Sequence, residues 1–323
     1  MPKISVIMTV YNLKPYVRRA VQSVMAQTMP DFELIIVNDG SYDGSAALLN
    51  ELARPEPRIR VFHTENRGVS QARNMGMEQA SGAWLTFLDG DDFYYPHALE
   101  TMYAKTGDCD IVVANYALVY GNDADPPFYH LPTEAAVNRP DRVAGFLEAR
   151  LEIGESAMNK LYRREFLMAT GVRFEPREEI FAEDSFFNAQ LLRDAGKICI
   201  ADQVVAGYCQ RHGSETYSCK EDLAARCIRF LDRLSQWYGH SCDDALKVRA
   251  VRLYGEVLRN EAMKNYPAFR KVVRDRRFRT LIKGADQRHL TRNRRTQLML
   301  LPFAPVLYMA LRRRRKRVLA GLR

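Results

Sequence analysis

Residues 84–96 read WLTFLDGDDFYYP. An apolar run typical of a buried strand ends at Asp89, and Asp91 and Asp92 follow at once. Carboxylates this close repel one another, and each raises the pKa of its neighbours. Such a cluster is costly unless a cation binds it or solvent screens it. The function of this stretch therefore depends on what neutralises its charges.

Apolar runs of strand length recur along the first third of the chain and alternate with helical segments. We expect strands at residues 4–10, 33–37, 59–62, 84–88 and 111–113. Strands that alternate with helices of about ten to fifteen residues indicate βαβ units. The sequence therefore predicts an α/β protein with a mostly parallel sheet flanked by helices.

Polar residues and glycines follow each of the first four predicted strands. They are Tyr11–Asn12, Asn38–Ser41, Glu65–Gly68 and Asp89–Asp92. In open α/β sheets, ligands bind outside the carboxyl ends of the strands. The sequence therefore predicts a ligand site at one edge of the sheet.

Two interpretations fit the acidic cluster at 89–92. Mg²⁺ or Mn²⁺ is usually held by one or two carboxylates together with substrate phosphates. A divalent cation bound there would neutralise the cluster and bring a diphosphate to the site. An exposed acidic turn ahead of the helix at Pro96 would explain the same residues without a ligand. The motif alone does not separate these interpretations.

Other candidate residues carry similar alternatives. Asp39 could accept hydrogen bonds from a base or ribose, or it could belong to a plain turn. Arg67 and Arg73 suit phosphate recognition, although both could be surface residues. Asp184 could be a general base or a helix cap. His212 could ligate a metal or be an ordinary surface or core residue.

The charge of the chain is concentrated at one end. The 323 residues carry a net charge of +9, but residues 288–323 hold 11 of the 48 Lys/Arg and none of the 39 Asp/Glu. The remaining chain is close to neutral. Cysteines show no CxxC spacing, and we expect reduced thiols at Cys109, Cys199, Cys209, Cys219, Cys227 and Cys242.

The composition divides the chain into three predicted regions. Residues 1–120 hold the alternating strands and helices, 121–220 begin with a Pro-rich loop and continue with mixed patterns, and 221–323 are helical and charged. Residues 298–311 are apolar but too short to span a bilayer, and RRRRKR follows at 312–317. The N-terminus has no signal-peptide pattern.

Apolar residues beside a polybasic patch indicate an interfacial anchor on an anionic membrane surface. We therefore expect a cytoplasmic protein, peripheral on the inner face of the plasma membrane. A helix that docks on the protein, with a solvated basic end, is the alternative. The tail lacks interleaved aromatic residues and any recognised nucleic-acid-binding module, so we expect no nucleic-acid partner.

Several motifs together resemble the inverting family 2 glycosyltransferases of the GT-A fold. They are ISVIMTVYN, FELIIVNDGSYDGS, the run from ENRG to FLDGDD, NKLYRREF at 159–166 and AEDSFFNAQLL at 182–192. The resemblance covers roughly residues 3–215. The P-loop, zincin, α/β-hydrolase and dinucleotide-binding signatures are absent from the sequence.

The resemblance implies that a sugar is moved from a nucleotide donor, UDP by preference, to a saccharide hydroxyl. The acceptor would be lipid-linked, as in surface polysaccharide synthesis. Asp184 would be the catalytic base, and Mn²⁺ or Mg²⁺ would be the cofactor with Asp91 and His212 as ligands. The donor would be bound by Thr9, Tyr11, Asp39, Arg67, Asp89, Gly90 and Asp91.

Two positions depart from the family pattern. Gly90 stands where Ser is common, and Cys209 stands where Arg is common, which weakens the roles assigned to the loop that contains His212. A catalytically silent sugar-binding or scaffold protein and a nucleotidyltransferase remain alternatives. The donor sugar, the acceptor, the linkage position and the oligomeric state are not fixed by the sequence.

Overall fold

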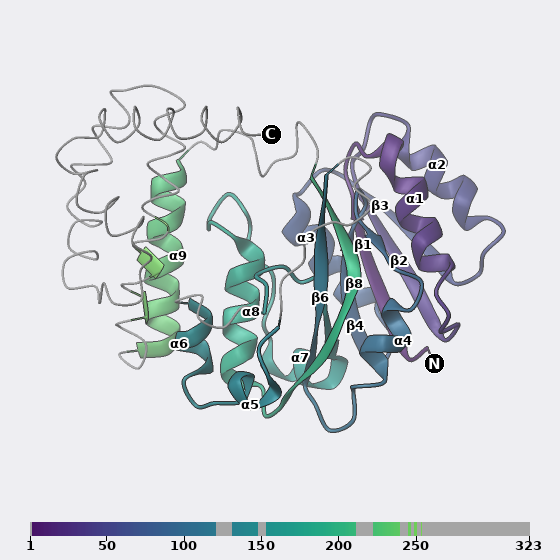
Figure 1. The fold of residues 1–323 in the computed structure, drawn as a ribbon. Helices are drawn as coiled ribbons and strands as arrows, with labels where there is room; N and C mark the ends of the chain where they lie inside the picture. Colours follow the sequence, from purple (N-terminus) through teal and green to yellow (C-terminus); the bar gives the residue numbers. More distant parts are fainter. Residues whose placement is uncertain are drawn as a thin grey trace, which may run out of the picture. The chain divides into compact units, whose positions relative to one another are not determined.

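The computed structural model describes residues 2–120, 131–147, 153–210 and 222–239, together with residues 245, 246, 249, 250 and 253 (Figure 1). The chain divides into two compact units, Met1–Ser218 and Cys219–Arg323. The sheet and the predicted site belong to the first unit.

The first four predicted strands are confirmed and form the parallel half of the sheet. Their spatial order is β3-β2-β1-β4, with all three pairings parallel. The strands are β1 Ile4–Val10, β2 Phe32–Asp39, β3 Ile59–Thr64 and β4 Trp84–Asp89. Nearly every residue of β1, β2 and β4 is buried, as expected for strands covered on both faces.

The other half of the sheet is mixed. The full order is β3-β2-β1-β4-β7-β6-β8-β5, in which β6 and β8 are parallel, while β7 is antiparallel to β4 and β6. β5 pairs with β8 in antiparallel fashion. These strands are β5 Phe93–Tyr94, β6 Ile111–Tyr120, β7 Lys160–Arg163 and β8 Ile198–Gln210. The fold class of a mostly parallel α/β sheet is confirmed, and β6 is longer than the predicted 111–113.

Helices cover both faces of the sheet (Figure 1). In α1, four buried residues at helical spacing (Val17, Ala20, Val21 and Val24) belong to the same core cluster as Val6 and Met8 of β1. On the opposite face of β1, α3 approaches so closely that a Cβ on Gly76 would lie 2.3 Å from Ile7 Cγ2. The helices of this unit are α1 Lys14–Met25, α2 Ser45–Ala53, α3 Val69–Gln79, α4 Ala98–Tyr103, α5 Glu134–Val137, α6 Arg142–Leu147, α7 Arg164–Thr170 and α8 Glu183–Asp194.

An aromatic cluster fixes α8 against the sheet. Phe187 of α8 stacks on Phe174 with ring centroids 3.9 Å apart, and both rings meet Phe87 of β4 edge-on. Tyr162 of β7 completes the cluster. Aromatic pairs of this kind stabilise a fold beyond the area that they bury. The cluster therefore sets where the start of α8 lies relative to the end of β4.

The expectation of reduced thiols is wrong for two cysteines. Cys109 and Cys199 form a disulfide although 90 residues separate them. Cys199 lies in β8 and Cys109 just before β6, and the pairing of Ile111 with Ile198 brings the two Cα atoms to 6.0 Å. Sequence spacing does not reveal such a pair, because it depends on the order of strands in the sheet. Cys209 and Cys227 are free thiols.

The described part of the second unit contains α9, Leu223–Tyr238, which lies within the region predicted to be helical. Its buried residues include Cys227, Phe230, Leu231 and Leu234. Among the described residues, no helix is long and apolar enough to cross a membrane. The predicted apolar segment 298–311 and the basic run 312–317 lie outside the described residues.

Candidate functional site

The carboxyl ends of the parallel strands meet at one edge of the sheet, as predicted. The register pairs Thr9 with Asp89 and Val10 with Asn38, and it pairs Asp39 with Thr64. The candidate residues that follow β1, β2, β3 and β4 therefore come together in space although they are spread over 80 residues.

Asp39 organises the loop that follows β3. Its carboxylate accepts hydrogen bonds from the backbone N–H groups of Arg67 at 2.8 Å and Gly68 at 2.9 Å. Gly40 beside it has a φ of +73°, and a Cβ there would lie 2.6 Å from the Asn66 nitrogen. Both the positive φ and the close approach require glycine. The acidic, glycine-bearing turn thus holds a neighbouring loop in place.

The loops after β1 and β2 are joined in the same manner. Asn12 N donates to Ser41 Oγ at 2.9 Å, and Tyr42 N donates to Asn12 Oδ1 at 3.0 Å. Next to this join, the rings of Tyr11 and Tyr42 meet edge-on at 6.2 Å. They are 42% and 83% exposed, so the edge presents an aromatic surface to solvent next to Asp39.

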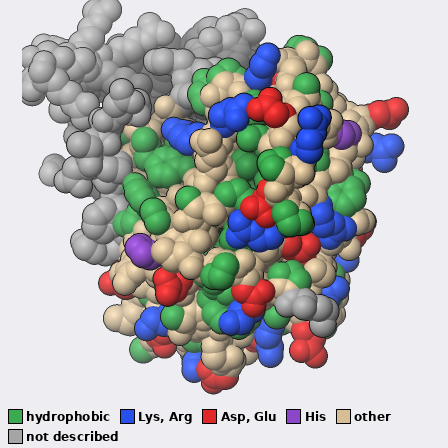
Figure 2. Space-filling model, turned by 90° about the vertical axis from the view of Figure 1, so that its right-hand side faces the viewer, with side chains coloured by type: hydrophobic (Ala, Val, Ile, Leu, Met, Phe, Trp, Pro, Cys, Tyr) green, Lys and Arg blue, Asp and Glu red, His purple; other side chains and the backbone are tan. Residues whose placement is uncertain are grey.

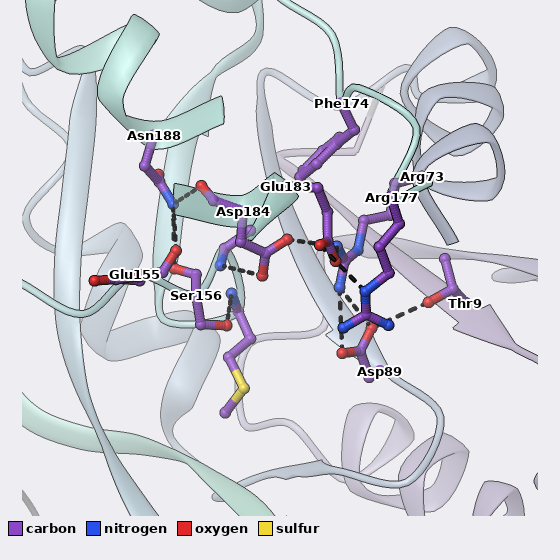
Figure 3. Close-up of polar contacts among 12 residues, drawn as sticks. Thr9, Arg73, Asp89, Glu155, Ser156, Phe174, Arg177, Glu183, Asp184 and Asn188 are labelled. Atoms are coloured by element: carbon purple, nitrogen blue, oxygen red, sulfur yellow. Dashed lines mark hydrogen bonds and ion pairs between the residues drawn. The ribbon is translucent and has the colours of Figure 1, made fainter. Parts of the chain in front are cut away.

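Arg73 of α3 neutralises the first carboxylate of the acidic cluster (Figure 3). Its Nη2 donates to both carboxylate oxygens of Asp89, at 3.0 and 3.2 Å, and Thr9 Oγ1 donates to Asp89 Oδ1 at 3.1 Å. Burial alone would raise the pKa of Asp89, but the charge and hydrogen bonds of Arg73 lower it below its ordinary value. Asp89 is therefore ionised and fixed in orientation.

The other two carboxylates of the cluster have separate environments. Asp92 is fully buried and accepts a hydrogen bond from Cys209 N at 2.8 Å. Burial and the charges of Asp91 and Asp89 raise its pKa well above the ordinary value. Asp91 is half-buried, and its backbone carbonyl accepts from Arg19 Nη2 at 2.7 Å. Asp89 is thus part of an ion pair, Asp92 is a buried acid, and Asp91 lies at the surface of the site.

Arg73 also joins this cluster to Asp184. Its Nη1 donates to Asp184 Oδ1 at 2.5 Å and lies 3.5 Å from Glu183 Oε1, so one guanidinium contacts three carboxylates. The side chain of Arg73 is buried, and Phe174 lies against it with its ring centroid 5.2 Å from Cζ. Burial lowers the pKa of Arg73, but the three carboxylates outweigh burial and raise it.

The start of α8 holds Asp184 in a mostly buried position. Oδ2 accepts from the backbone N–H of Ala157 at 3.3 Å, while Oδ1 takes the bond from Arg73. Burial raises the pKa of Asp184 to about 6; Glu183 and Asp89 act in the same direction, and Arg73 opposes them. Ala182, which directly precedes the helix, has a φ of +57°, a strained conformation of the kind found at functional sites.

The sequence profile described as Glycosyl transferase family 2 matches residues 5–171, which is just over half of the chain. The chain belongs to glycosyl transferase family 2. The eight-stranded α/β fold is the GT-A fold.

Curated relatives support the assignment to glycosyl transferase family 2. Uncharacterized glycosyltransferase EpsJ of Bacillus subtilis is 32% identical over 223 residues, which cover 67% of this chain and 63% of EpsJ. EpsH of the same organism is 35% identical over 198 residues, covering 58% of this chain and 55% of EpsH. The chain therefore spans only about half to two thirds of the length of these relatives.

A solved structure shows the same fold. S. aureus TarS 1-349, crystallised in complex with UDP-GlcNAc, is similar with a TM-score of 0.69 at 18% identity. The similarity covers 95% of this chain and 88% of that chain. At this level of identity the likeness concerns the fold alone.

The structure brings most of the predicted site residues of this family 2 protein together, with two exceptions. The Arg67 side chain is 70% exposed and lies 3.9 Å from Glu65, so it is the backbone of Arg67 that contacts Asp39. His212 lies outside the described residues. Gly90 fits tightly, since a Cβ would lie 3.0 Å from Thr9 O and Val10 Cγ2.

The contacts of three arginines at the site were not predicted from the sequence. Arg73 suited phosphate recognition or a surface position by its sequence alone, whereas it binds three carboxylates of the protein. Arg177 lies 3.4 Å from Glu183 and adds a second cation to this group. Arg19 contacts Cys209 Sγ at 3.0 Å and packs on Phe93, so a guanidinium from α1 lies beside position 209. No local motif marks these residues, because their partners are distant in sequence.

Carboxylate oxygens at this edge match the ligand preference of a hard divalent cation. Asp89 and Asp91 are the candidates, although Asp89 already contacts Arg73 and Thr9. Among the described residues, the group whose potential ligand atoms all lie within 4.8 Å of one another is instead Asp108, Cys109 and Cys199. Two of these are the disulfide cysteines, so that group does not resemble a metal site.

Proposed function

We propose that this protein is a glycosyltransferase that moves a sugar from a nucleotide donor, UDP by preference, to a hydroxyl group of a saccharide acceptor. The observation that carries the proposal is the link through Arg73 between Asp89, at the strand edge, and the largely buried Asp184. This link supports a role for Asp184 as a base beside the donor. Membership of glycosyl transferase family 2 supports the same activity.

The donor would bind along the carboxyl ends of β1, β2 and β4. Tyr11 offers an exposed ring for the base, and Asp39 lies next to it with its two bonded amides. Thr9 and Asp89 are bonded to one another, and Gly90 lets the chain lie close to Thr9. The family resemblance is the reason to prefer UDP, and S. aureus TarS, which has the same fold, was crystallised in complex with UDP-GlcNAc.

A divalent cation, Mn²⁺ or Mg²⁺, fits the oxygen donors here. We assign Asp91 and, from the family resemblance, His212 as its ligands. When bound, such an ion stabilises the negative charge that develops on a leaving diphosphate. Arg19 fixes the backbone of Asp91 at 2.7 Å and adds positive charge on the same side. Asp89 is oriented by Thr9 and Arg73, so its direction is set before any ligand binds.

Asp184 would act as the general base. Its pKa of about 6 leaves it ionised at neutral pH. The raised pKa also makes it a stronger base than an ordinary Asp. Asp184 removes the proton from the acceptor hydroxyl as its oxygen attacks the anomeric carbon. The bond from that carbon to the diphosphate oxygen breaks on the opposite face, and its electron pair leaves with the nucleotide. A single displacement inverts the anomeric centre.

The regions predicted from the sequence take roles accordingly. Residues 1–120 would bind the donor, and 121–220 would bind the acceptor. Residues 221–323 would form a helical extension whose basic tail contacts the inner face of the plasma membrane. A lipid-linked acceptor in surface polysaccharide synthesis fits such a tail.

The charge of the rest of the chain is mixed, and Figure 2 shows Lys/Arg interspersed with Asp/Glu on the side of α1 and α2.

A donor panel tests the proposal. Nucleotide release would be measured from UDP-GlcNAc, UDP-glucose, UDP-galactose and GDP-mannose, with Mn²⁺, with Mg²⁺ and with EDTA. We expect metal-dependent release from one UDP-sugar and its loss in Asp91→Ala. Binding of UDP without release from any donor would favour a catalytically silent protein. Absence of both binding and release would contradict the proposal.

A further inference from the structure

Next to Asp184 lies a buried lysine that the proposed transfer does not use. Lys160, the first residue of β7, is 1% exposed. Its ammonium group donates to Ser156 O at 2.7 Å, Asn159 Oδ1 at 2.9 Å and Gly154 O at 3.0 Å. A lysine has three N–H donors, so every one of them is used inside the protein. Two of the three acceptors are backbone carbonyls of one short turn, residues 153–158.

The 153–158 turn is also held by β6 and by α8. Asn159 Nδ2 donates to Ala114 O at 2.6 Å, which fixes the end of the turn to β6. Asn188 of α8 donates to Glu155 O at 2.9 Å and also to Asp184 O at 2.9 Å (Figure 3). Tyr162 OH in turn donates to Asn188 Oδ1 at 2.7 Å. All these side chains are buried, so the turn is tied to the same helix that carries Asp184.

One amide of this turn points into the site. Ala157 N–H donates to Asp184 Oδ2, while the neighbouring carbonyl of Ser156 accepts from Lys160. The conformation that offers the amide to Asp184 is thus the one that Lys160 stabilises from behind. Burial lowers the pKa of Lys160 to about 7, against the charges of Asp184 and Glu155. Burial disfavours the charged form of a lysine, and the hydrogen bonds to the turn and to Asn159 offset part of that cost.

We propose that Lys160 is a positioning residue for the transfer reaction: it holds the 153–158 turn so that the Ala157 amide orients the carboxylate of Asp184 toward the acceptor. The inference rests on the proposed function for the step that Asp184 performs. Lys160 itself touches no substrate in this account. It acts through the turn, and the donor edge around Asp39 does not depend on it.

The test compares Lys160→Met and Lys160→Gln with a control, Ser5→Ala. Ser5 is also buried and joins Glu33 Oε1 at 2.7 Å to Gly82 N at 2.8 Å, but it lies at the amino end of β1, away from the site. Lys160→Met removes all three hydrogen bonds, and Lys160→Gln keeps an amide donor in case the first variant does not fold. Thermal unfolding of each variant shows how far stability alone has changed.

Two measurements are made on each variant. Hydrogen–deuterium exchange follows the peptide that covers residues 153–158 and the one that covers residues 66–68, where the amides bind Asp39. Steady-state kinetics with the donor selected by the panel gives kcat and the donor KM. Losing hydrogen bonds to a charged group should change the exchange rate or kcat by about tenfold or more.

For both Lys160 variants we expect about tenfold or more faster exchange at 153–158 and a kcat at least about tenfold lower, with the larger effects in Lys160→Met. The donor KM and exchange at 66–68 should not change. Ser5→Ala should lower the unfolding temperature and leave kcat and exchange at 153–158 unchanged. Unchanged exchange at 153–158, or faster exchange with wild-type kcat, would overturn the inference. Wild-type protein that released no nucleotide would refute the proposed function instead, and exchange would still decide whether Lys160 holds the turn.

Discussion

Asp39 and Asp184 are both largely buried carboxylates at the candidate site, yet the protein holds them in different ways. Asp39 accepts from two backbone N–H groups in one nearby loop, those of Arg67 and Gly68. Asp184 is held by a buried guanidinium, that of Arg73, from a helix 111 residues away in sequence, and by one amide of a turn. The proposed donor edge, at the carboxyl ends of β1, β2 and β4, is thus organised by backbone geometry and the region around Asp184 by charge.

Because of this difference, substitutions in the two regions should have different effects. A change at the donor edge should act locally, on a loop and on the affinity for a nucleotide. A change around Asp184 alters a group of charges that share Arg73 (Asp89, Glu183 and Asp184), and so it should alter chemistry and stability together. Substitutions in the two regions should therefore separate binding from turnover.

The largest effect is expected for Asp184→Asn. The substitution keeps the shape of the side chain but removes the base, which is worth about a hundredfold to ten-thousandfold in rate. Transfer should be lost to that extent, while the dissociation constant for UDP stays within about threefold of wild type, because Asp39 and its loop are unchanged. Calorimetric titration with UDP, alongside nucleotide release, checks both parts. Parallel loss of UDP affinity would show that the two regions are not separable.

Arg73→Met should destabilise the protein strongly. Removing the guanidinium leaves buried carboxylates without their partner, and breaking a buried pair typically costs about 3–5 kcal/mol. The matched control is Arg58→Met, which breaks a more exposed pair with Glu56 at 2.7 Å. Pairs near the surface contribute about 0–1 kcal/mol. Urea unfolding of both variants gives the comparison, and equal losses would contradict the assignment of Arg73 as the centre of the charge group.

A smaller effect is expected at the donor edge. Asp39→Asn removes the charge and turns one carboxylate oxygen into an NH₂ group, so one of the hydrogen bonds from Arg67 N and Gly68 N is lost. A hydrogen bond to a charged group contributes about 1.5–3 kcal/mol. The donor KM should rise by a corresponding factor, with kcat changed less. If kcat alone fell, the contrast between the two aspartates would be wrong.

The pH dependence should be smaller still and should arise around Asp184. A base with a pKa of about 6 loses its proton as pH rises through 6, so the transfer rate should fall by roughly tenfold from pH 7 to pH 5. Stability has the opposite sign. The folded-state pKa lies above the unfolded value, so the stabilisation by protonated Asp184 is fully present below about pH 4 and is lost as pH rises through 6. A rate that is flat from pH 5 to pH 7 would contradict the assignment of this base.

The sequence predicted well where the carboxyl ends of the parallel strands meet, because that information is local. Strands of β-rich apolar residues end in Asp39 and Asp89, and strand ends in such sheets meet at one edge. The antiparallel β7 and the length of β6 were not predicted. These depend on pairings between segments far apart, such as Ile111 with Tyr162, which no periodicity reveals.

The region around Asp184 was predicted only in part. The family resemblance identified Asp184, but nothing local showed that Arg73 would bind it, or that the Ala157 amide would complete its contacts. The same limit applies to the Cys109–Cys199 disulfide. Ion pairs between residues distant in sequence can be predicted only when the order of the strands is known.

The central claim is that Asp184 activates an acceptor for a single displacement on a nucleotide sugar. The most direct test is time-resolved proton NMR of donor hydrolysis, with water as the acceptor and the α-linked UDP-sugar selected by the panel as the donor. The β-anomer of the free sugar should form first, before it equilibrates in solution, and Asp184→Asn should form neither anomer at a measurable rate. Initial release of the α-anomer, or unchanged hydrolysis by Asp184→Asn, would contradict this account of the site.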